Sequence, residues 1–129
     1  MKSIGVIFSF VLLAFVGCGS NNNSKGYKNI GTKEFQQKIN EENVVVLDVR
    51  TPQEVAEGYI KGTTLFIDIN SPDFEKNINS LDKSKTYLVY CRSGARSSRA
   101  ANFMSTNGFG NVYNLSGGIL SWDGAIEKP

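Results

Sequence analysis

One side chain in this sequence is well placed to act as a nucleophile, Cys91. It follows the apolar run 86–90 and begins the loop Cys91-Arg92-Ser93-Gly94-Ala95-Arg96-Ser97. Backbone N–H groups of a tight loop and of a helix start stabilise negative charge at their centre. Gly94 allows the sharp turn, and Arg92 and Arg96 add positive potential. We therefore predict a lowered pKa for the Cys91 thiol, which would make its thiolate available as a nucleophile.

The composition removes several other kinds of chemistry. The 129-residue chain contains no histidine, so it has no Cys-His or Ser-His-Asp catalytic arrangement and no histidine ligand for zinc. Its two cysteines, Cys18 and Cys91, are too few for a cysteine-rich metal cluster or a disulfide framework. A formal net charge of +2 gives no reason to expect nucleic acid as a partner. A nucleophile in this chain must be activated by something other than an imidazole.

The Cys91 loop also has a purely structural interpretation. Free cysteine is often a small buried hydrophobe at a strand end, and Arg92, Arg96 and Arg99 could form an ordinary solvated helix face. The order of strand, cysteine, glycine loop and helix, with both loop arginines close behind the cysteine, favours the functional interpretation.

The elements that position this loop can be read from the periodicity of apolar residues. Strand-like runs, which are apolar and rich in β-branched or aromatic residues, occupy 44–47, 65–67, 86–90 and 112–115. Helix-like runs occupy 32–40, 51–58, a segment opening at 71–72 and reaching 78, and 95–106. This alternation predicts an α/β fold: a mostly parallel central sheet of about five strands with helices on both faces. Ligands of such sheets bind beyond the carboxyl ends of the strands, where Cys91 lies.

The second of these helices has a well-defined start. Thr51 is suited to cap it, Pro52 to occupy the first helical position, and Glu54 to complete a capping box. Gly58 is suited to end it, as Gly108 is for the helix that begins at Ala95.

The N-terminus reads as a targeting segment. The apolar run 4–16 is too short for a spanning helix, which needs about 20 residues. It resembles a bacterial lipoprotein signal, with Phe15-Val16-Gly17-Cys18 in place of the lipobox. The resemblance implies a signal peptide at 1–17, a lipid-bearing Cys18 and a membrane anchor, with the domain exported to the periplasm or cell exterior. Residues 18–26 read as a flexible tether and 27–129 as the domain. A plain secretory signal or an uncleaved anchor is the alternative.

The Cys91 loop resembles the active-site loop of the rhodanese sulfurtransferases, which implies a single rhodanese-like domain. Three further motifs occur in that family's order. They are Leu47-Asp48-Val49-Arg50 with the helix that follows it, Gly58-Tyr59-Ile60-Lys61-Gly62, and Leu115-Ser116-Gly117-Gly118-Ile119-Leu120-Ser121-Trp122. Each motif alone is weak, but together they cover about residues 27–126.

The resemblance implies sulfur transfer through a persulfide on Cys91. The sulfur would come from a small anionic donor such as thiosulfate and pass to cyanide or a thiol, without a cofactor or metal. The backbone N–H groups of Arg92, Ser93, Gly94, Ala95 and Arg96 would hold the persulfide, with the Ser93 hydroxyl as an extra donor. Arg92 and Arg96 would also attract the donor. Asp48 and Arg50 would support the site by pairing with neighbouring charges; a helix cap or a surface ion pair is the alternative for each of them.

The chain departs from the family pattern in the segment that follows Gly58. Relatives usually read Gly-His-Ile-Pro-Gly-Ala there, whereas this chain has Tyr59 for the histidine, Lys61 for the proline and Thr63 for the alanine. That histidine is generally structural, so its replacement bears on local packing. Trp122 is expected to pack the C-terminal segment onto the sheet.

Three other functions are consistent with a cysteine loop. Phosphatases of related fold place five residues between cysteine and arginine, whereas four separate Cys91 from Arg96, a smaller ring that suits one sulfur atom. A persulfide carrier or other non-enzymatic binding module would keep the cysteine without turnover. A redox role would need a resolving thiol in trans, because Cys18 would be lipidated.

Overall fold

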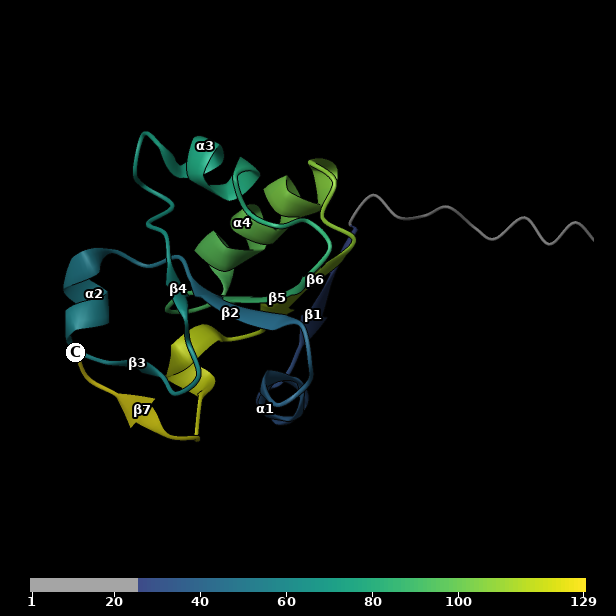
Figure 1. Cartoon of the computed structure of the whole chain (residues 1–129). Helices are drawn as coiled ribbons and strands as arrows, with labels where there is room; N and C mark the ends of the chain where they lie inside the picture. The colour runs from purple at the N-terminus through teal and green to yellow at the C-terminus, as the bar shows by residue number, and fades with distance from the viewer. Residues whose placement is uncertain (1–25) are drawn as a thin grey trace, which may run out of the picture.

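Five strands form one sheet at the centre of the computed structural model, which describes residues 26–129 (Figure 1). The strands are β1 (Tyr27–Ile30), β2 (Val44–Asp48), β4 (Leu65–Phe66), β5 (Thr86–Tyr90) and β6 (Asn111–Leu115). They lie in the order β1-β6-β5-β2-β4, and every neighbouring pair is parallel. The predicted α/β fold with a parallel sheet of about five strands is confirmed.

The predicted signal peptide (1–17), the lipid attachment at Cys18 and all but the last residue of the tether (18–26) lie outside the described residues. Within residues 26–129, no helix has both the length and the apolar character that crossing a membrane requires.

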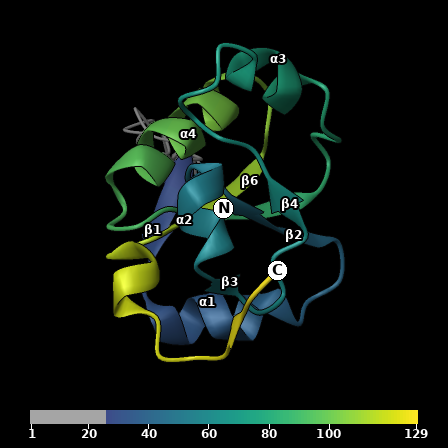
Figure 2. The same cartoon turned by 90° about the vertical axis from the view of Figure 1, so that its left-hand side faces the viewer.

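Helices cover both faces of the sheet, as the sequence predicted. α1 (Thr32–Ile39) lies on one face, whereas α3 (Phe74–Asn79) and α4 (Ala95–Thr106) lie on the other (Figures 1 and 2). α2 (Pro52–Ala56) lies beyond the carboxyl end of β2, and the 3₁₀ helix η1 (Gly118–Ser121) follows β6. The carboxyl ends of β2 and β5 are therefore flanked by α2, η1 and the start of α4.

The strand period of two separates the core into two clusters. In β5, Tyr87 and Val89 face α3 and α4, whereas Leu88 and Tyr90 face α1. The cluster on the α4 side contains Leu47, Val49, Phe74, Ile78, Cys91, Ala100, Met104 and Phe109 among others. The cluster on the α1 side contains Ile30, Phe35, Val46, Ile60 and Leu115. The same alternation sends Cys91 to the α4 side of the sheet.

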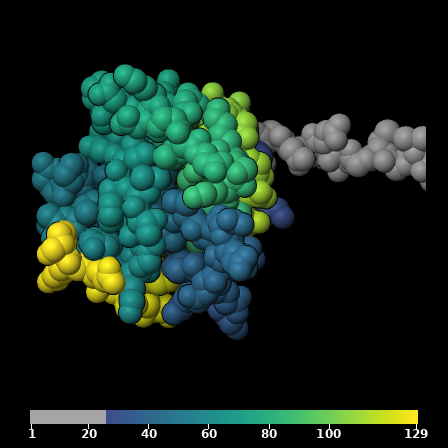
Figure 3. Space-filling model, viewed as in Figure 1, coloured from purple at the N-terminus to yellow at the C-terminus, as the bar shows by residue number. Residues whose placement is uncertain are grey.

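A short antiparallel ribbon closes the fold. It pairs β3 (Tyr59–Ile60) with β7 (Ile126–Glu127), two segments far apart in the sequence. The last residues of the chain thus lie on the surface beside the segment that follows α2 (Figure 3).

One helix begins later than the sequence predicted. The helix expected to open at Ser71-Pro72 is α3, which begins at Phe74. The Ser71 hydroxyl accepts a hydrogen bond from the Asp73 N–H (3.2 Å), and the Ser71 carbonyl accepts one from the Phe74 N–H (3.1 Å). These bonds hold 71–73 as a turn, because serine side chains that bond the nearby backbone compete with helix formation.

Candidate active site

Cys91 lies directly after β5, at the carboxyl edge of the sheet. Cys91 is 1% exposed and forms no disulfide within the described residues. Its carbonyl accepts a hydrogen bond from the Ile119 N–H (2.9 Å), and the Arg92 carbonyl accepts one from the Leu120 N–H (3.1 Å). The Cys91 loop is therefore held on one side by β5 and on the other by η1.

Two donors approach the sulfur of Cys91. The Gly94 N–H donates to Sγ at 3.1 Å, and the Ser97 hydroxyl donates to Sγ at 3.3 Å. Burial raises the pKa of the Cys91 thiol, but hydrogen bonds from Ser97, Gly94 and Ser93 lower it by more, so the pKa lies below its ordinary value. The predicted direction of the shift is thus found in the structure.

Gly94 is required by the shape of this loop. Its φ of +102° belongs to the left-handed region, which glycine adopts without steric cost. A side chain there would also place its Cβ 3.2 Å from the backbone nitrogen of Gly117. The loop thus turns its N–H groups towards Cys91 only because residue 94 lacks a side chain.

Ser97 is a site residue that the sequence analysis left unassigned. The sequence favoured the hydroxyl of Ser93, but Ser93 is exposed and contributes its backbone N–H. Ser97 is fully buried in the first turn of α4, facing the sulfur. The sequence could have indicated Ser97, because it lies three residues after Gly94. A side chain at that spacing points back towards the start of the helix, where the sulfur lies.

The two loop arginines differ in what they can offer an anion. Arg92 is exposed, whereas Arg96 donates from Nη1 and Nη2 to the two carboxylate oxygens of Glu54 at 2.7 and 2.8 Å. The hydrogen bonds to Glu54 outweigh burial and raise the pKa of Arg96. The same bonds lower the pKa of Glu54 to about 2. Arg96 therefore already has a counterion, and neutral donors provide the contacts to Sγ.

Glu54 links the Cys91 loop to α2. The predicted capping box is present: the Thr51 side chain accepts from the Glu54 N–H, and the Glu54 side chain accepts from the Thr51 N–H. Its carboxylate also holds Arg96, 42 positions along the chain. The orientation of Arg96 thus depends on where α2 begins.

Asp48 and Arg50 form a buried ion pair with each other at the end of β2. Arg50 Nη2 lies 2.7 Å from Asp48 Oδ2, with the two residues 6% and 0% exposed. Arg50 Nε and the Arg50 backbone N–H also donate to this carboxylate, and Nη2 donates to the Gly58 carbonyl at 2.7 Å. Burial lowers the pKa of Arg50, but Asp48 raises it by more. The pair fixes the path of the chain around α2, and Arg50 lines the same cavity as Arg92 of the Cys91 loop.

The replacements in the segment after Gly58 are accommodated by local contacts. The Thr63 hydroxyl lies 2.8 Å from the Tyr90 hydroxyl and 2.7 Å from the Ile60 carbonyl. The Tyr59 ring packs edge-to-face on Phe66, with centroids 5.0 Å apart. Thr63 and Tyr59 therefore each have a defined packing or hydrogen-bonding role in this segment.

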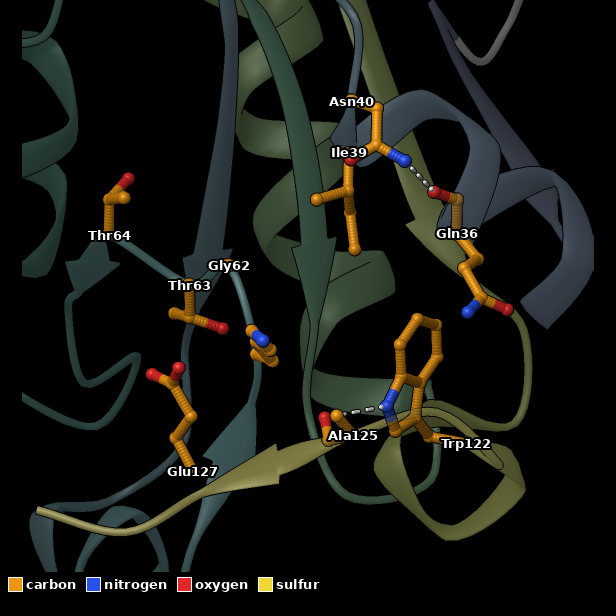
Figure 4. A pocket seen from close by; sticks show the side chains of 10 residues that line it. Gln36, Ile39, Asn40, Gly62, Thr63, Thr64, Trp122, Ala125 and Glu127 are labelled. Carbon is orange, nitrogen blue, oxygen red and sulfur yellow. Dashed lines mark hydrogen bonds between the residues drawn. The ribbon is translucent and has the colours of Figure 1, made fainter.

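Two cavities border Trp122, the residue that follows η1. One, of about 530 Å³, lies between α2, η1 and β7 and is lined by Arg92 as well as by Leu120 and Ile126, which are exposed. The other, of about 510 Å³, lies between α1 and the 61–64 segment (Figure 4). Trp122 lines both; its ring packs edge-to-face on Phe35 with centroids 5.8 Å apart, on the α1 side of the sheet. The first cavity is the one that adjoins the Cys91 loop.

The parallel sheet, the cysteine at its carboxyl edge and the N–H groups around the sulfur define a class of α/β proteins with a cysteine loop between a strand and a helix. A family profile described as "Rhodanese-like domain" matches residues 31–125. The chain belongs to the rhodanese-like domain family.

Named relatives and solved structures agree with this assignment. The chain is 37% identical to the putative sulfurtransferase YtwF of Bacillus subtilis over 101 residues, which cover 78% of this chain and 94% of that protein. It is 36% identical over 115 residues to the tRNA uridine(34) hydroxylase of Pelagibacter ubique, covering 88% of this chain but only 38% of that longer protein. The crystal structure of a rhodanese-like domain protein from Staphylococcus aureus superposes with a TM-score of 0.68 at 33% identity, covering 79% of this chain and 98% of that one. The family and its sulfurtransferase-named relative support a role in sulfur transfer, whereas the other named relative is a hydroxylase.

Proposed function

We propose that this protein is a rhodanese-type sulfurtransferase that works through a persulfide on Cys91. The Cys91 thiolate attacks the outer sulfur of a thiosulfate-like donor, and the S–S bond of the donor breaks. Sulfite leaves with the bonding electron pair, so the anionic persulfide replaces the thiolate. Cyanide or a thiolate then attacks the outer persulfide sulfur, the S–S bond to Cys91 breaks, and the thiolate is restored. Charge balances in both half-reactions. Because sulfite leaves before the acceptor reacts with the covalent persulfide, we expect ping-pong kinetics.

The observation that carries this proposal is the pair of donors on a buried sulfur. The Gly94 N–H and the Ser97 hydroxyl both contact Cys91 Sγ. Donors fixed before the reaction stabilise a thiolate leaving group without reorganising at that moment. The exposed Arg92, at the mouth of the loop, would draw in an anionic donor.

The test replaces the nucleophile in the full chain. Cys91→Ser should abolish transfer of sulfur from thiosulfate to cyanide, measured as thiocyanate. Cys18→Ser is the matched control and should retain turnover. Intact-protein mass spectrometry after exposure to thiosulfate should show one added sulfur atom on the parent chain and none on Cys91→Ser. Thiocyanate formation by Cys91→Ser would contradict the proposal, and a stable persulfide without turnover would favour a carrier.

We also propose that Cys18 carries a lipid anchor and that the tether joins the domain at the end of the sheet opposite the Cys91 loop. The described chain enters the sheet at Tyr27, which pairs with Val112 at the amino end of β6, whereas Cys91 follows the carboxyl end of β5. The four residues of β1 run parallel to β6 and so separate the two ends of the sheet by roughly 13 Å. In the native host, the parent protein should incorporate a labelled fatty acid and Cys18→Ser should not, with sulfur transfer intact in both; equal labelling of Cys18→Ser would contradict the anchor.

A further inference from the structure

The Gly94 carbonyl oxygen has more donors than it needs. It lies 3.0 Å from the Ser98 N–H, 3.2 Å from the Ser97 hydroxyl oxygen and 3.4 Å from Asn114 Nδ2. A carbonyl oxygen has two lone pairs. Ser98 and one of the other two donors are enough to satisfy it.

Ser97 has the opposite imbalance. Its hydroxyl oxygen lies within hydrogen-bond distance of two acceptors, Cys91 Sγ at 3.3 Å and the Gly94 carbonyl at 3.2 Å. A hydroxyl carries one proton, so it can donate to only one of them at a time. Whatever satisfies Gly94 by other means leaves the Ser97 proton for the sulfur.

Asn114 is built as a donor at this point. It lies on β6, it is 3% exposed, and its Nδ2 donates to Asn29 Oδ1 at 2.9 Å as well as to the Gly94 carbonyl. Turning the amide over would aim Oδ1 at the Gly94 oxygen, so the observed orientation is the one that Gly94 favours. Among the described residues, Asn114 Oδ1 is buried without a hydrogen-bond partner. An unpaired buried acceptor is costly, and the two bonds from Nδ2 are what Asn114 gains in return.

We propose that Asn114 is a positioning residue of the Cys91 loop: its amide occupies the Gly94 carbonyl and thereby leaves the Ser97 hydroxyl proton for Cys91 Sγ. Its effect on the thiolate is indirect, through Ser97. Its importance for turnover rests on the proposed sulfur transfer, but its effect on the thiol does not.

Asn114 is neutral, so replacing it adds and removes no charge. The charged groups of the loop and of the elements beside it are Arg92 and Arg96 from the loop and the start of α4, Glu54 from α2, and the pair of Asp48 and Arg50 at the end of β2. Within the described residues, the hydrogen bonds of Asn114 go to Asn29 and Gly94, and none goes to a charged side chain. A shift in Cys91 reactivity caused by a substitution at Asn114 would therefore report where the Ser97 hydroxyl donates its proton, and not a change in net charge.

The test measures the thiol directly in the full chain. Alkylation of Cys91 by iodoacetamide is followed against pH, with peptide mass spectrometry separating Cys91 from Cys18. Asn114→Leu removes both donors at similar volume, and Asn114→Ala does so without adding bulk should leucine not fit. Either variant should move the midpoint to higher pH and slow alkylation near pH 7 by about threefold to tenfold.

Two further variants decide whether the effect passes through Ser97. In a Ser97→Ala background, Asn114→Leu or Asn114→Ala should cause no further shift. Asn29→Ala, which removes the other acceptor of Nδ2 on an exposed residue, should leave the midpoint unchanged.

An equal shift with and without Ser97, an equal shift from Asn29→Ala, or no shift in a folded Asn114 variant would overturn the proposal. Thiocyanate turnover is measured on the same samples. If the parent chain shows no turnover but the Asn114 variants still shift the alkylation midpoint, the proposed function fails and this inference stands. If the parent chain turns over but the midpoint does not shift, this inference fails and the proposed function stands.

Discussion

Two neighbouring turns of this protein bury a charged or ionisable group at the same edge of the sheet, and they compensate it differently. The Asp48–Arg50 turn follows β2, and the Cys91–Arg96 loop follows β5, with Asp48 paired in register to Tyr90. In the first turn, a buried carboxylate is matched by a buried guanidinium, which also holds the Gly58 carbonyl. In the second, the buried sulfur is met by a backbone N–H and a hydroxyl.

The difference explains why one turn is structural and the other can be reactive. In a buried ion pair, each charge is compensated by the other. Breaking the pair leaves an uncompensated buried charge, so neither group is free to bind a ligand. Neutral dipoles stabilise a thiolate without neutralising it, so the sulfur stays nucleophilic and the same donors remain available to a persulfide. Arg96, in the first turn of α4, is already paired with Glu54 and makes no hydrogen bond to the sulfur among the bonds of the described residues.

The largest effect on stability is expected at the ion pair. Asp48→Asn removes the charge that compensates Arg50, and we expect the free energy of unfolding to fall by about 3–5 kcal/mol. Urea titration followed by tryptophan fluorescence measures it. Cys91→Ser, in the neighbouring loop after β5, is the control and should change the unfolding free energy far less. Equal losses from the two variants would show that the turns are not compensated differently.

The next effect is expected on the reactivity of the loop. Ser97→Ala removes a hydrogen bond to the thiolate, which is worth about 1.5–3 kcal/mol for a charged acceptor. The pKa of Cys91 should rise, and alkylation near neutral pH should slow by about tenfold or more. Ser93→Ala is the matched control, since Ser93 is exposed and contributes through its backbone. A larger shift from Ser93→Ala than from Ser97→Ala would restore the sequence-based choice of hydroxyl.

The smallest effect is expected at the link between the two regions. Arg96 lowers the pKa of Glu54 to about 2 from 4.5, so the ionised Glu54 stabilises the folded chain above pH 4.5 and loses this contribution as the pH falls towards 2. Because both side chains are partly exposed, Glu54→Gln should cost only about 1 kcal/mol near neutral pH. The difference between the parent and the variant should vanish at low pH. A difference that stays constant with pH would mean that the ion pair is not its source.

Local elements of the fold and site were predictable because their causes lie close together in the sequence. The capping box of α2 needs only residues 51–54, and the helix start at Ala95 follows from Gly94 and the residues around it. The five-stranded parallel sheet followed from alternating strand and helix patterns, but β1 was not predicted, since Lys28 and Asn29 are exposed on an edge strand and weaken its apolar pattern. The ribbon of β3 and β7 has two residues per strand, too few for any periodicity.

The sequence by itself determined that Cys91 would stand on a strand-to-helix turn rich in N–H donors, because a strand end, a glycine and a helix start are local features. Tertiary structure decided which groups meet there. Arg96 is bound to Glu54 from another element, Asp48 and Arg50 pair with each other, and Asn114 reaches Gly94 from a strand 20 positions away. Such partners depend on how the elements pack, since a hydrogen bond is set by distance and direction in space and not by separation along the chain.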